Sequence, residues 1–449
     1  MGKGHYLRIR PAGKLQGTVM LPGDKSLSHR ALLLAALGEG ESVIDNCLHA
    51  GVTQAMMECL RNLGVQIRVN EAPGGQPTGS AAVVVGGRGL RGLNEPEQPL
   101  YCGGSATTMR LMSGILAGQP VRSTLDGNAR LRERPMDRIV EPLRAKGAVI
   151  RTTAGNAPLT FFPAELKSSS HVLPTASAQV KSALLLAGLF ADGPTTVSEP
   201  HGSRDHTERM LRNLGVRVEE RLDRAGRHVV RILEGISRLP RMHMRLPSDP
   251  SSAAFIIVAG LIVPGSDIAV PGVCVNPGRI GLLSVLREAG ADITLRMEPN
   301  VNGVEPVATI EVAAGPLTNV TIHGHRVTAM IDEFPIFAVA ATQANGTTVV
   351  RDAAELRLKE SDRIQAVTEE LTKLGARMEP REDGFVVHGP TRLKGAMVDG
   401  RGDHRLAMSL AVAGLAAEGE TLIQGWEVMN ESFPEFPSVL RRLGADVSW

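Results

Sequence analysis

The chain has 449 residues, a length that exceeds one ordinary hydrophobic core and predicts two domains. Its formal charge of +2 excludes a strong overall basic field, and its aromatic content of 3% argues against a stacking surface for single-stranded nucleic acid. No apolar run reaches the roughly 18 residues of a membrane span, and the polar N-terminus lacks a signal-peptide core. We therefore expect a cytoplasmic protein that binds neither nucleic acid nor membrane.

The first predicted helix follows a turn and contains the apolar run 31–37, with Asp24 or Ser26 as its cap. Lys25 and Arg30 crowd its first turn, where free backbone N–H groups and the helix dipole disfavour cations. A bound anion would offset that repulsion, so this helix start predicts a phosphate or carboxylate site. A basic first turn that is only solvated is the alternative.

A phrase typical of the end of an amphipathic helix recurs six times along the chain. Each copy resembles LRNLGV and closes with a glycine suited to the left-handed conformation, at positions 64, 147, 215, 290, 375 and 444. A β-branched segment tends to follow. Each repeat therefore predicts a small unit of helices and strands.

A second phrase recurs once in each repeat and consists of a polar turn, an apolar Ala/Leu-rich helix, a glycine and a strand. These helices are apolar nearly all round, so we expect them to be buried. The six units divide naturally into three and three, with a seam in the Pro-containing stretch 238–250. The N-terminal strand 5–12 could belong with the C-terminal half. The six copies begin near Asp24, Ser105, Ser177, Asp249, Asp332 and Asp403.

Cations stand at corresponding places near the starts of these buried helices. Several helix dipoles aimed at one anionic ligand would explain them. The alternative is that each cation pairs with a neighbouring carboxylate, as Arg405 could with Asp403. The cations are Lys25, Arg30, Arg110, Lys181 and Arg405.

Two predicted loops carry further charge, LRERPMDR at 131–138 and ELRLKESDR at 355–363. Solvated charged helix starts are the alternative to a functional role for them. The sequence contains no nucleotide-binding glycine motif, no nucleophile elbow, no metal motif and no CxxC pair among its four cysteines. Any chemistry must therefore come from carboxylates, lysines and arginines acting on an anionic small molecule.

Six phrases resemble the 5-enolpyruvylshikimate-3-phosphate (EPSP) synthase family, from about residue 8 to the end: LPGDKSLSHR, LRERPMDRI, SAQVKSALLLAGL, SRDHTERML, ELRLKESDRI and GDHRLAMSLAVAGL. The phrases DEFP and SRDHTE look more like its class II branch, in which glyphosate-tolerant bacterial enzymes occur. The resemblance implies an α/β (α+β) fold of two similar domains with a ligand cleft between them. Each domain would hold three βαβαββ units with buried parallel helices, an inside-out α/β barrel. The expected domains are 24–246 and a discontinuous 1–23 plus 247–449.

The same resemblance implies an enzyme, a 3-phosphoshikimate 1-carboxyvinyltransferase of the shikimate pathway to chorismate and aromatic amino acids. Such an enzyme moves the enolpyruvyl group of phosphoenolpyruvate onto the 5-hydroxyl of shikimate 3-phosphate and releases phosphate. It needs no cofactor and no metal, its partners are these two small molecules, and we expect a monomer.

By resemblance, Asp332 would take the proton from the 5-hydroxyl and Lys359 would bind the shikimate ring hydroxyls. Glu360, with Lys25, would protonate the methylene carbon and later remove that proton. The side chains that would hold shikimate 3-phosphate are Lys25, Ser26, Arg30, Ser177, Gln179 and Arg204. Those that would hold phosphoenolpyruvate are Lys25, Arg134, Gln179, Arg363 and Arg405.

The chain departs from the family pattern at three positions. Ala106 stands where the family usually has glycine, and its methyl group would project toward the phosphoenolpyruvate pocket and crowd the longer glyphosate molecule. We therefore expect a glyphosate-tolerant enzyme. Gly104 replaces an asparagine, and Glu431 stands where some members place a phosphoenolpyruvate-binding lysine, so Glu431 receives no ligand role.

Two rival functions stay open. UDP-N-acetylglucosamine 1-carboxyvinyltransferase shares the fold and the enolpyruvyl donor, but its usual reactive cysteine is missing from the loop before Arg134, and the phrase DKSLSHR is foreign to it. The other rival is a non-catalytic anion-binding protein with a decayed site. Loss of activity with retained binding in Asp332→Ala and Glu360→Ala would favour the enzyme.

Overall fold

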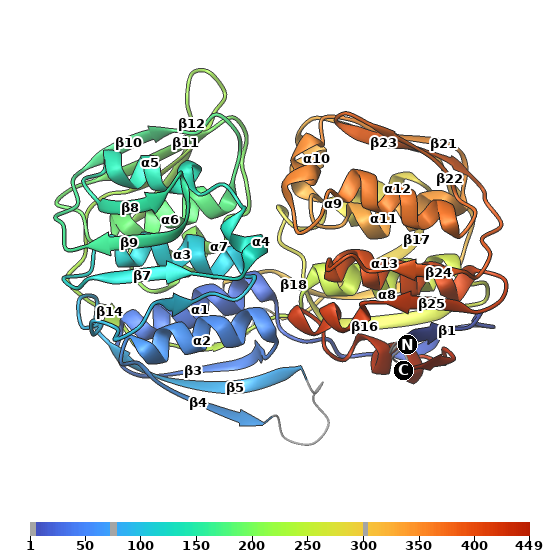
Figure 1. The fold of residues 1–449 in the computed structure, drawn as a ribbon, viewed down its shortest axis with the longest axis horizontal. Helices are drawn as coiled ribbons and strands as arrows, with labels where there is room; N and C mark the ends of the chain where they lie inside the picture. Colours follow the sequence, from blue (N-terminus) through green and yellow to red (C-terminus); the bar gives the residue numbers. More distant parts are fainter. Residues whose placement is uncertain (1–5, 72–78, 300–303) are drawn as a thin grey trace. The chain divides into compact units, whose positions relative to one another are not determined.

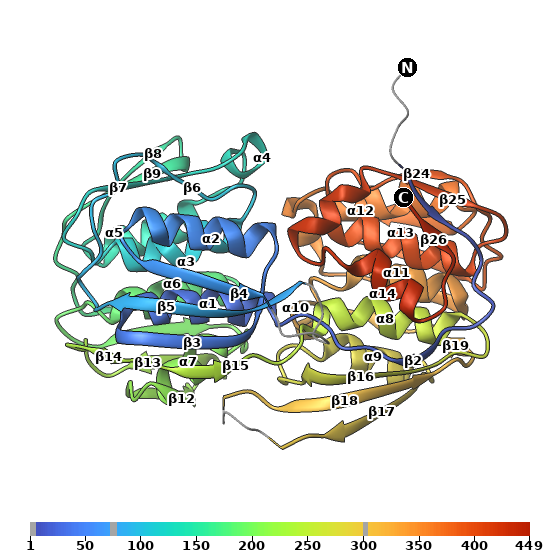
Figure 2. The same ribbon diagram turned by 90° about the horizontal axis from the view of Figure 1, so that it is seen from below.

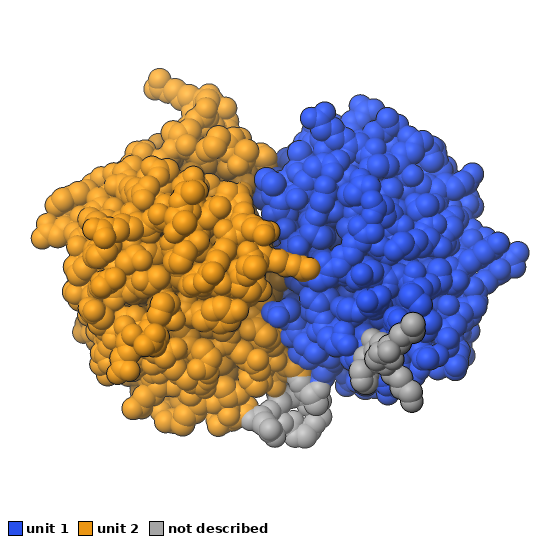
Figure 3. Space-filling view, in the orientation of Figure 1, with its two compact units in different colours: residues 1–22, 247–299, 306–449 blue, residues 23–246, 300–305 orange. Residues whose placement is uncertain are grey.

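The structure is a computed structural model that describes residues 6–71, 79–299 and 304–449. It divides into two compact units (Figure 3): unit 1 comprises 1–22, 247–299 and 306–449, and unit 2 comprises 23–246 and 300–305. The sequence pattern gave no sign that Val304 and Glu305 would belong to unit 2. Within the described ranges, no helix combines the length and apolar character that crossing a membrane requires.

Six helices form the interior of the two units, three in each (Figure 1). Most of their side chains are buried, as their continuous apolar runs predict. Their N-cap residues match the predicted starts except for the fifth helix, which Glu333 caps one residue later than predicted. The helices are α1 (Lys25–Leu37), α3 (Ala106–Leu116) and α6 (Ala178–Gly188) in unit 2, and α8 (Pro250–Ile262), α11 (Phe334–Gln343) and α13 (His404–Ala416) in unit 1.

Six amphipathic helices cover the units. Each precedes one of the six predicted glycines, and all six glycines have positive φ, between 84° and 104°. That conformation turns the chain out of the helix and into the next strand at little steric cost. The helices are α2 (Gly51–Asn62), α5 (Asp137–Ala145), α7 (His206–Asn213), α9 (Gly281–Glu288), α12 (Arg363–Lys373) and α14 (Phe436–Arg442).

Unit 2 contains three mixed sheets, in which the strand after each buried helix pairs antiparallel with a hairpin strand and parallel with an edge strand. Their orders are β14-β3-β5-β4, with β15 also on β3, then β6-β7-β9-β8 and β10-β11-β13-β12. The strands are β3 (Gly38–Leu48), β4 (Gln66–Glu71), β5 (Ser80–Arg88), β6 (Leu100–Tyr101), β7 (Ser123–Asp126), β8 (Val149–Thr153), β9 (Asn156–Phe162), β10 (Ser169–Val172), β11 (Thr195–Glu199), β12 (Val218–Leu222), β13 (His228–Ile232), β14 (Leu239–Pro240) and β15 (His243–Arg245).

Unit 1 repeats this plan with the orders β17-β18-β16-β2, β19-β21-β23-β22, with β20 also on β21, and β24-β25-β1-β26 (Figure 2). The first described strand, β1, pairs antiparallel with β25 and β26 near the C-terminus. The strands are β1 (Leu7–Ile9), β2 (Gln16–Thr18), β16 (Asp267–Cys274), β17 (Asp292–Met297), β18 (Val307–Ala313), β19 (Leu317–Thr318), β20 (Thr321–Ile322), β21 (Ala344–Val350), β22 (Arg377–Arg381), β23 (Gly384–Gly389), β24 (Met397–Asp399), β25 (Thr421–Gln424) and β26 (Val447–Ser448).

Each unit has its own hydrophobic core, formed where the buried helices meet the inner faces of the sheets. The four cysteines are buried and free. The predicted α/β fold with three repeats per unit is confirmed. Because apolar side chains enclose the helix bodies, the charged residues of α1, α3, α6 and α13 lie near the start of each helix.

Candidate active site

The first turn of α1 holds Lys25 and Ser26, and both residues are partly buried. Asp24 caps this helix, since its carboxylate accepts the backbone N–H of Leu27 at 2.7 Å. The turn therefore combines an ammonium group, a hydroxyl and the positive end of a helix dipole. Together they are suited to bind an oxyanion.

Arg30, one turn further along α1, is buried and only 3% exposed. Its guanidinium donates hydrogen bonds to the Ser26 carbonyl at 2.9 Å and to the hydroxyls of Ser182 and Thr207, both at 2.7 Å. Ser182 lies on α6 and Thr207 on α7. Arg30 thus links three helices of unit 2, a structural task that its place in the sequence did not reveal.

Gln179, in the first turn of α6, has both ends of its amide bonded. Its oxygen accepts from Arg110 Nη1 at 2.6 Å, and its nitrogen donates to Thr107 Oγ1 at 3.0 Å. These bonds fix the direction of the amide and join α6 to the start of α3. Ala106, the first residue of α3, is adjacent to Thr107 and is 5% exposed.

Three other predicted binding residues of unit 2 lie on loops or at a helix start, and all are partly buried. Ser177 is the N-cap residue of α6, but its hydroxyl makes no capping hydrogen bond to the described backbone. Arg134 lies between α4 (Ala129–Arg132) and α5, and Arg204 lies in the loop between β11 and α7. Side chains in such segments can reach a ligand without disturbing the core.

Lys181 is one of the helix-start cations that pairs with carboxylates. Its ammonium group is fully buried and lies 2.8 Å from both Glu199 Oε1 and Glu208 Oε1, which are also fully buried. Carboxylate pairing is therefore the correct interpretation for this lysine. Burial favours a neutral Glu199, but His228 and Lys181 outweigh it and lower the pKa of Glu199 to about 2.

Arg363 is the centre of the charged group in unit 1. Its side chain is 1% exposed, and its Nε donates to Asp403 Oδ2 at 2.8 Å while its Nη2 donates to Glu360 Oε2 at 2.7 Å. Its Nη1 lies 3.8 Å from Asp332 Oδ1. One buried guanidinium thus holds Glu360 and lies beside Asp332, the two carboxylates predicted to act as acid and base.

Arg405, in the first turn of α13, completes this group from the other side. Its Nη2 lies 3.9 Å from Asp332 Oδ2, and its Nη1 lies 3.8 Å from Glu333 Oε1. The suggested side-chain pair between Arg405 and Asp403 does not form. The Asp403 carboxylate accepts the backbone N–H of Arg405 at 2.9 Å, while its side-chain ion pair is with Arg363.

Lys359 follows the short helix η1 (Ala354–Leu358) and has 15% of its side chain exposed. Its ammonium group donates to Glu355 Oε1 at 2.8 Å. Burial lowers the pKa of Lys359, while Glu355 and Asp332 oppose that shift. The lysine therefore belongs to the same electrostatic group as Asp332.

The structure explains one of the departures from the family pattern. A Cβ atom added to Gly104 would lie 3.1 Å from Asn128 Nδ2, so the Asn128 amide lies beside the position from which a side chain at 104 would extend. Asn128 also caps α4 through the N–H of Leu131 at 2.9 Å. Glu431 ends the short helix η2 (Trp426–Glu431) and is exposed.

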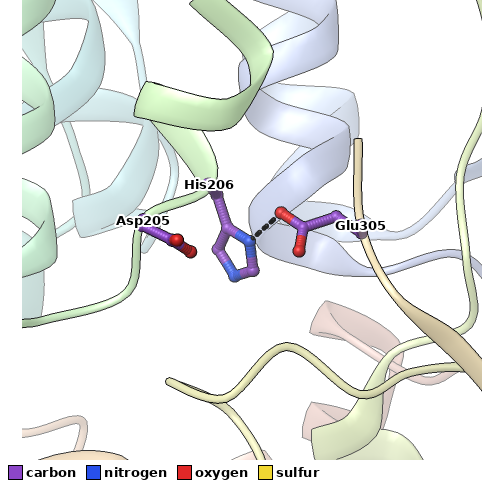
Figure 4. A group of neighbouring side chains, drawn as sticks. All are labelled: Asp205, His206 and Glu305. Atoms are coloured by element: carbon purple, nitrogen blue, oxygen red, sulfur yellow. Dashed lines mark hydrogen bonds and ion pairs between the residues drawn. The ribbon is translucent and has the colours of Figure 1, made fainter. Parts of the chain in front are cut away.

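Asp205, His206 and Glu305 of unit 2 offer ligand atoms within 4.8 Å of one another (Figure 4). His206 Nδ1 lies 2.6 Å from Glu305 Oε1. Arg209 already supplies a cation, because its Nε lies 2.7 Å from Asp205 and 3.9 Å from Glu305. Ion pairing therefore accounts for this group.

Sequence reasoning missed a second buried network behind the Asp332 group. Arg279 donates to Asp249 Oδ1 and to the Ser251 hydroxyl, both at 3.0 Å, and that hydroxyl donates to Glu333. The polar residues at the starts of α8 and α11 gave a signal for this network. Arg279 gave none, because it comes from a loop about 30 residues away in sequence.

Fold and site together define an α/β protein built of repeated units whose helix starts concentrate cations and carboxylates. A family model described as EPSP synthase (3-phosphoshikimate 1-carboxyvinyltransferase) matches residues 9–440. The chain belongs to the EPSP synthase family.

Individual relatives agree with the family model over nearly the full length of the chain. The 3-phosphoshikimate 1-carboxyvinyltransferase of Gloeobacter violaceus is 49% identical over 443 residues, which cover 98% of this chain and 99% of that protein. The enzyme of the same name from Pelotomaculum thermopropionicum is 46% identical over 446 residues, covering 98% and 99%. The EPSP synthase structure from Acinetobacter baumannii matches with a TM-score of 0.84 and 38% identity, covering 99% of this chain and 100% of that chain.

Proposed function

We propose that this protein transfers the enolpyruvyl group of phosphoenolpyruvate to the 5-hydroxyl of shikimate 3-phosphate and releases phosphate. The observation that carries the proposal is the Arg363 group, in which one buried guanidinium holds Glu360 and lies beside Asp332. Addition to an enolpyruvyl double bond needs a base, an acid and positive charge, and this group brings together two carboxylates and a guanidinium to which we assign these roles. The names of the relatives support the same reaction.

In the proposed reaction, Asp332 accepts the proton of the 5-hydroxyl, and the oxygen of that hydroxyl forms a bond to C2 of phosphoenolpyruvate. Glu360, with Lys25, donates a proton to the methylene carbon C3, and C2 becomes tetrahedral. Glu360 then takes a proton back from C3 as the bond between C2 and the phosphate oxygen breaks. The double bond re-forms, phosphate leaves, and the hydroxyl proton passes from Asp332 to solvent or to the departing phosphate.

The remaining predicted residues bind and orient the substrates. Arginines suit the carboxylate and phosphate of phosphoenolpyruvate because a guanidinium can donate two parallel hydrogen bonds. We assign this role to Arg134, Arg363 and Arg405, and also to Gln179 and Lys25. Lys359 binds the shikimate ring hydroxyls, and shikimate 3-phosphate is held by Lys25, Ser26, Arg30, Ser177, Gln179 and Arg204.

Phosphate release by the purified protein tests the reaction. The assay contains shikimate 3-phosphate and phosphoenolpyruvate, each omitted in turn, and then UDP-N-acetylglucosamine as the rival acceptor. Release that requires shikimate 3-phosphate is the expected result. Release only with the sugar nucleotide would identify the rival transferase, and no release with either acceptor would favour the non-catalytic anion-binding protein.

We also propose that the enzyme tolerates glyphosate. Ala106 is the first residue of α3, and its neighbour Thr107 accepts a hydrogen bond from Gln179, which is assigned to phosphoenolpyruvate. A methyl group at this position removes space that the longer glyphosate molecule needs. Because only one methyl group is involved, we expect the affinity for glyphosate to fall about tenfold. Glyphosate inhibition of the native enzyme and of Ala106→Gly measures the effect, and equal inhibition of both would contradict it.

Finally, we propose a cytoplasmic monomer of the class II type that needs no cofactor. The phrases DEFP and SRDHTE support the class, and the formal charge of +2 suggests no polyanionic partner. Light scattering coupled to size-exclusion chromatography measures the mass in solution, which should equal the 47.7 kDa of one chain. If the enzyme needs no cofactor, it should keep full activity after exhaustive chelation and dialysis.

A further inference from the structure

The loop between β11 and α7 is tied down at Ser203, the residue immediately before Arg204. The Glu199 carboxylate accepts the backbone N–H of Ser203 at 2.8 Å and its hydroxyl at 2.8 and 2.9 Å. Lys181 Nζ donates to the Ser203 carbonyl at 3.2 Å. Three different groups of one loop residue are therefore held by one buried ion pair.

This ion pair is closed to ligands. Lys181 and Glu199 are both 0% exposed, and an ammonium group has three N–H donors. Those donors face Glu199, Glu208 and the Ser203 carbonyl. Because neither side chain is exposed to a ligand, the effect of the pair on a substrate must pass through the loop that it holds.

We propose that Lys181 and Glu199 are positioning residues for the phosphate of shikimate 3-phosphate, acting through Ser203 on Arg204. Lys181 lies on α6, the helix that also carries Gln179 and is capped by Ser177. The pair thus fixes the Arg204 loop against the helix that holds two other residues assigned to the same substrate. This inference rests on the proposed function, and it adds two residues that hold the Arg204 loop in place.

The 3-phosphate of shikimate 3-phosphate does not react, and this determines which kinetic constant the variants should change. A contact to a non-reacting group stabilises the bound substrate and the transition state alike, so its loss raises KM and spares kcat. Without the ion pair, the loop that carries Arg204 would become ordered only when the substrate binds. The entropy lost at that point weakens the affinity for shikimate 3-phosphate. The KM for phosphoenolpyruvate should not change.

Glu208 offers a matched control. It pairs with the same lysine at the same 2.8 Å, and among the described residues it makes no hydrogen bond to Ser203. Each glutamine variant removes one carboxylate from the same buried ammonium group, but only Glu199 also bonds Ser203 and lies 3.6 Å from His228. If the cluster only stabilised the fold, neither variant would change the KM for shikimate 3-phosphate.

The experiment compares the full-length native enzyme with Glu199→Leu, Glu199→Gln and Glu208→Gln in steady-state kinetics. For Glu199→Leu we expect the KM for shikimate 3-phosphate to rise about tenfold, with kcat and the KM for phosphoenolpyruvate within about twofold. Glu199→Gln keeps an acceptor oxygen for the Ser203 N–H, so its KM should rise only about threefold. Glu208→Gln should lower the melting temperature while its KM stays within about twofold of the native value.

Equal KM values for Glu199→Gln and Glu208→Gln would overturn the proposal, as would a fall in kcat without a change in KM. Should Glu199→Leu not fold, the two glutamine variants still decide the question. The affinity for shikimate, which lacks the phosphate, is a second readout and should be equal in all variants. A native enzyme that releases no phosphate would contradict the proposed function instead, so the two failures are distinguishable.

Discussion

Lys181 in unit 2 and Arg363 in unit 1 are both buried cations near the start of a helix, yet their surroundings differ. The Lys181 ammonium group donates hydrogen bonds to Glu199 and to the Ser203 carbonyl, and it forms an ion pair with Glu208 at 2.8 Å. Arg363 donates through Nε and Nη2, but its Nη1 makes no hydrogen bond to any described residue. Asp332 Oδ1 lies 3.8 Å from that nitrogen.

The difference separates a scaffold from a binding group. A buried donor without a partner costs free energy that a bound anion can recover, whereas a saturated one gains nothing from a ligand. Position at a helix start alone did not distinguish the two cations. The variants below test this contrast between the Lys181 cluster and the Arg363 group.

The largest expected effect is on catalysis in Asp332→Asn. Replacing the proposed base should lower kcat about a thousandfold, because an amide cannot accept the hydroxyl proton. The contacts of Asp332 with Arg363 and Arg405 are long, at 3.8 and 3.9 Å, so their loss alone should change stability little. Steady-state kinetics and a melting curve measure both quantities, with the exposed-site variant Asp446→Asn as the control. Retained turnover would remove Asp332 from the mechanism.

Next in size is the stability loss in Lys181→Met. The change leaves Glu208 buried without its cation and Glu199 with only His228 to pair with, and it should lower the free energy of unfolding by about 3 kcal/mol. The kcat of the folded enzyme should stay within about twofold, because Lys181 contacts no reacting group in the proposed reaction. Chemical denaturation measures the loss, and a thousandfold fall in kcat at native stability would place Lys181 in the reaction instead.

Arg363→Lys should lower kcat/KM about a hundredfold, since lysine keeps the charge but loses the fork that reaches Asp403 and Glu360 together. The matched control is Arg217→Lys, an exposed arginine paired with Glu234. That variant should behave as the native enzyme. Similar kcat/KM values for both variants would show that charge alone suffices at position 363.

The smallest effect concerns pH. Glu199 and Glu220 raise the pKa of His228 from 6.5 to about 9. The protonated imidazole therefore stabilises the fold fully below about pH 6.5, and that contribution is lost as the pH rises through 9. The unfolding free energy of the native protein should fall toward that of His228→Gln over this range, by about 1 kcal/mol. A gap between the two proteins that does not change with pH would contradict the assignment.

Local patterns predicted the fold well and the contacts poorly. The buried helices and the six glycines were predictable because a polar turn, an apolar run and a positive-φ glycine act within one stretch of chain. The partners of Arg30 were not, since Ser182 lies 152 residues away in sequence and Thr207 lies 177. The suggested pair between Arg405 and Asp403 was wrong for the same reason, because Asp403 bonds Arg363, which lies 40 residues away.

Phosphorus NMR of a reaction mixture tests the proposed enolpyruvyl transfer directly, because it follows the phosphates of phosphoenolpyruvate and shikimate 3-phosphate at once. The native enzyme is mixed with shikimate 3-phosphate and phosphoenolpyruvate in equal amounts. We expect the phosphoenolpyruvate signal to be replaced by that of inorganic phosphate, while the shikimate 3-phosphate signal shifts to that of a new monoester in equal yield. Inorganic phosphate without a new monoester would mean hydrolysis rather than transfer, and an unchanged spectrum would contradict the proposed reaction altogether.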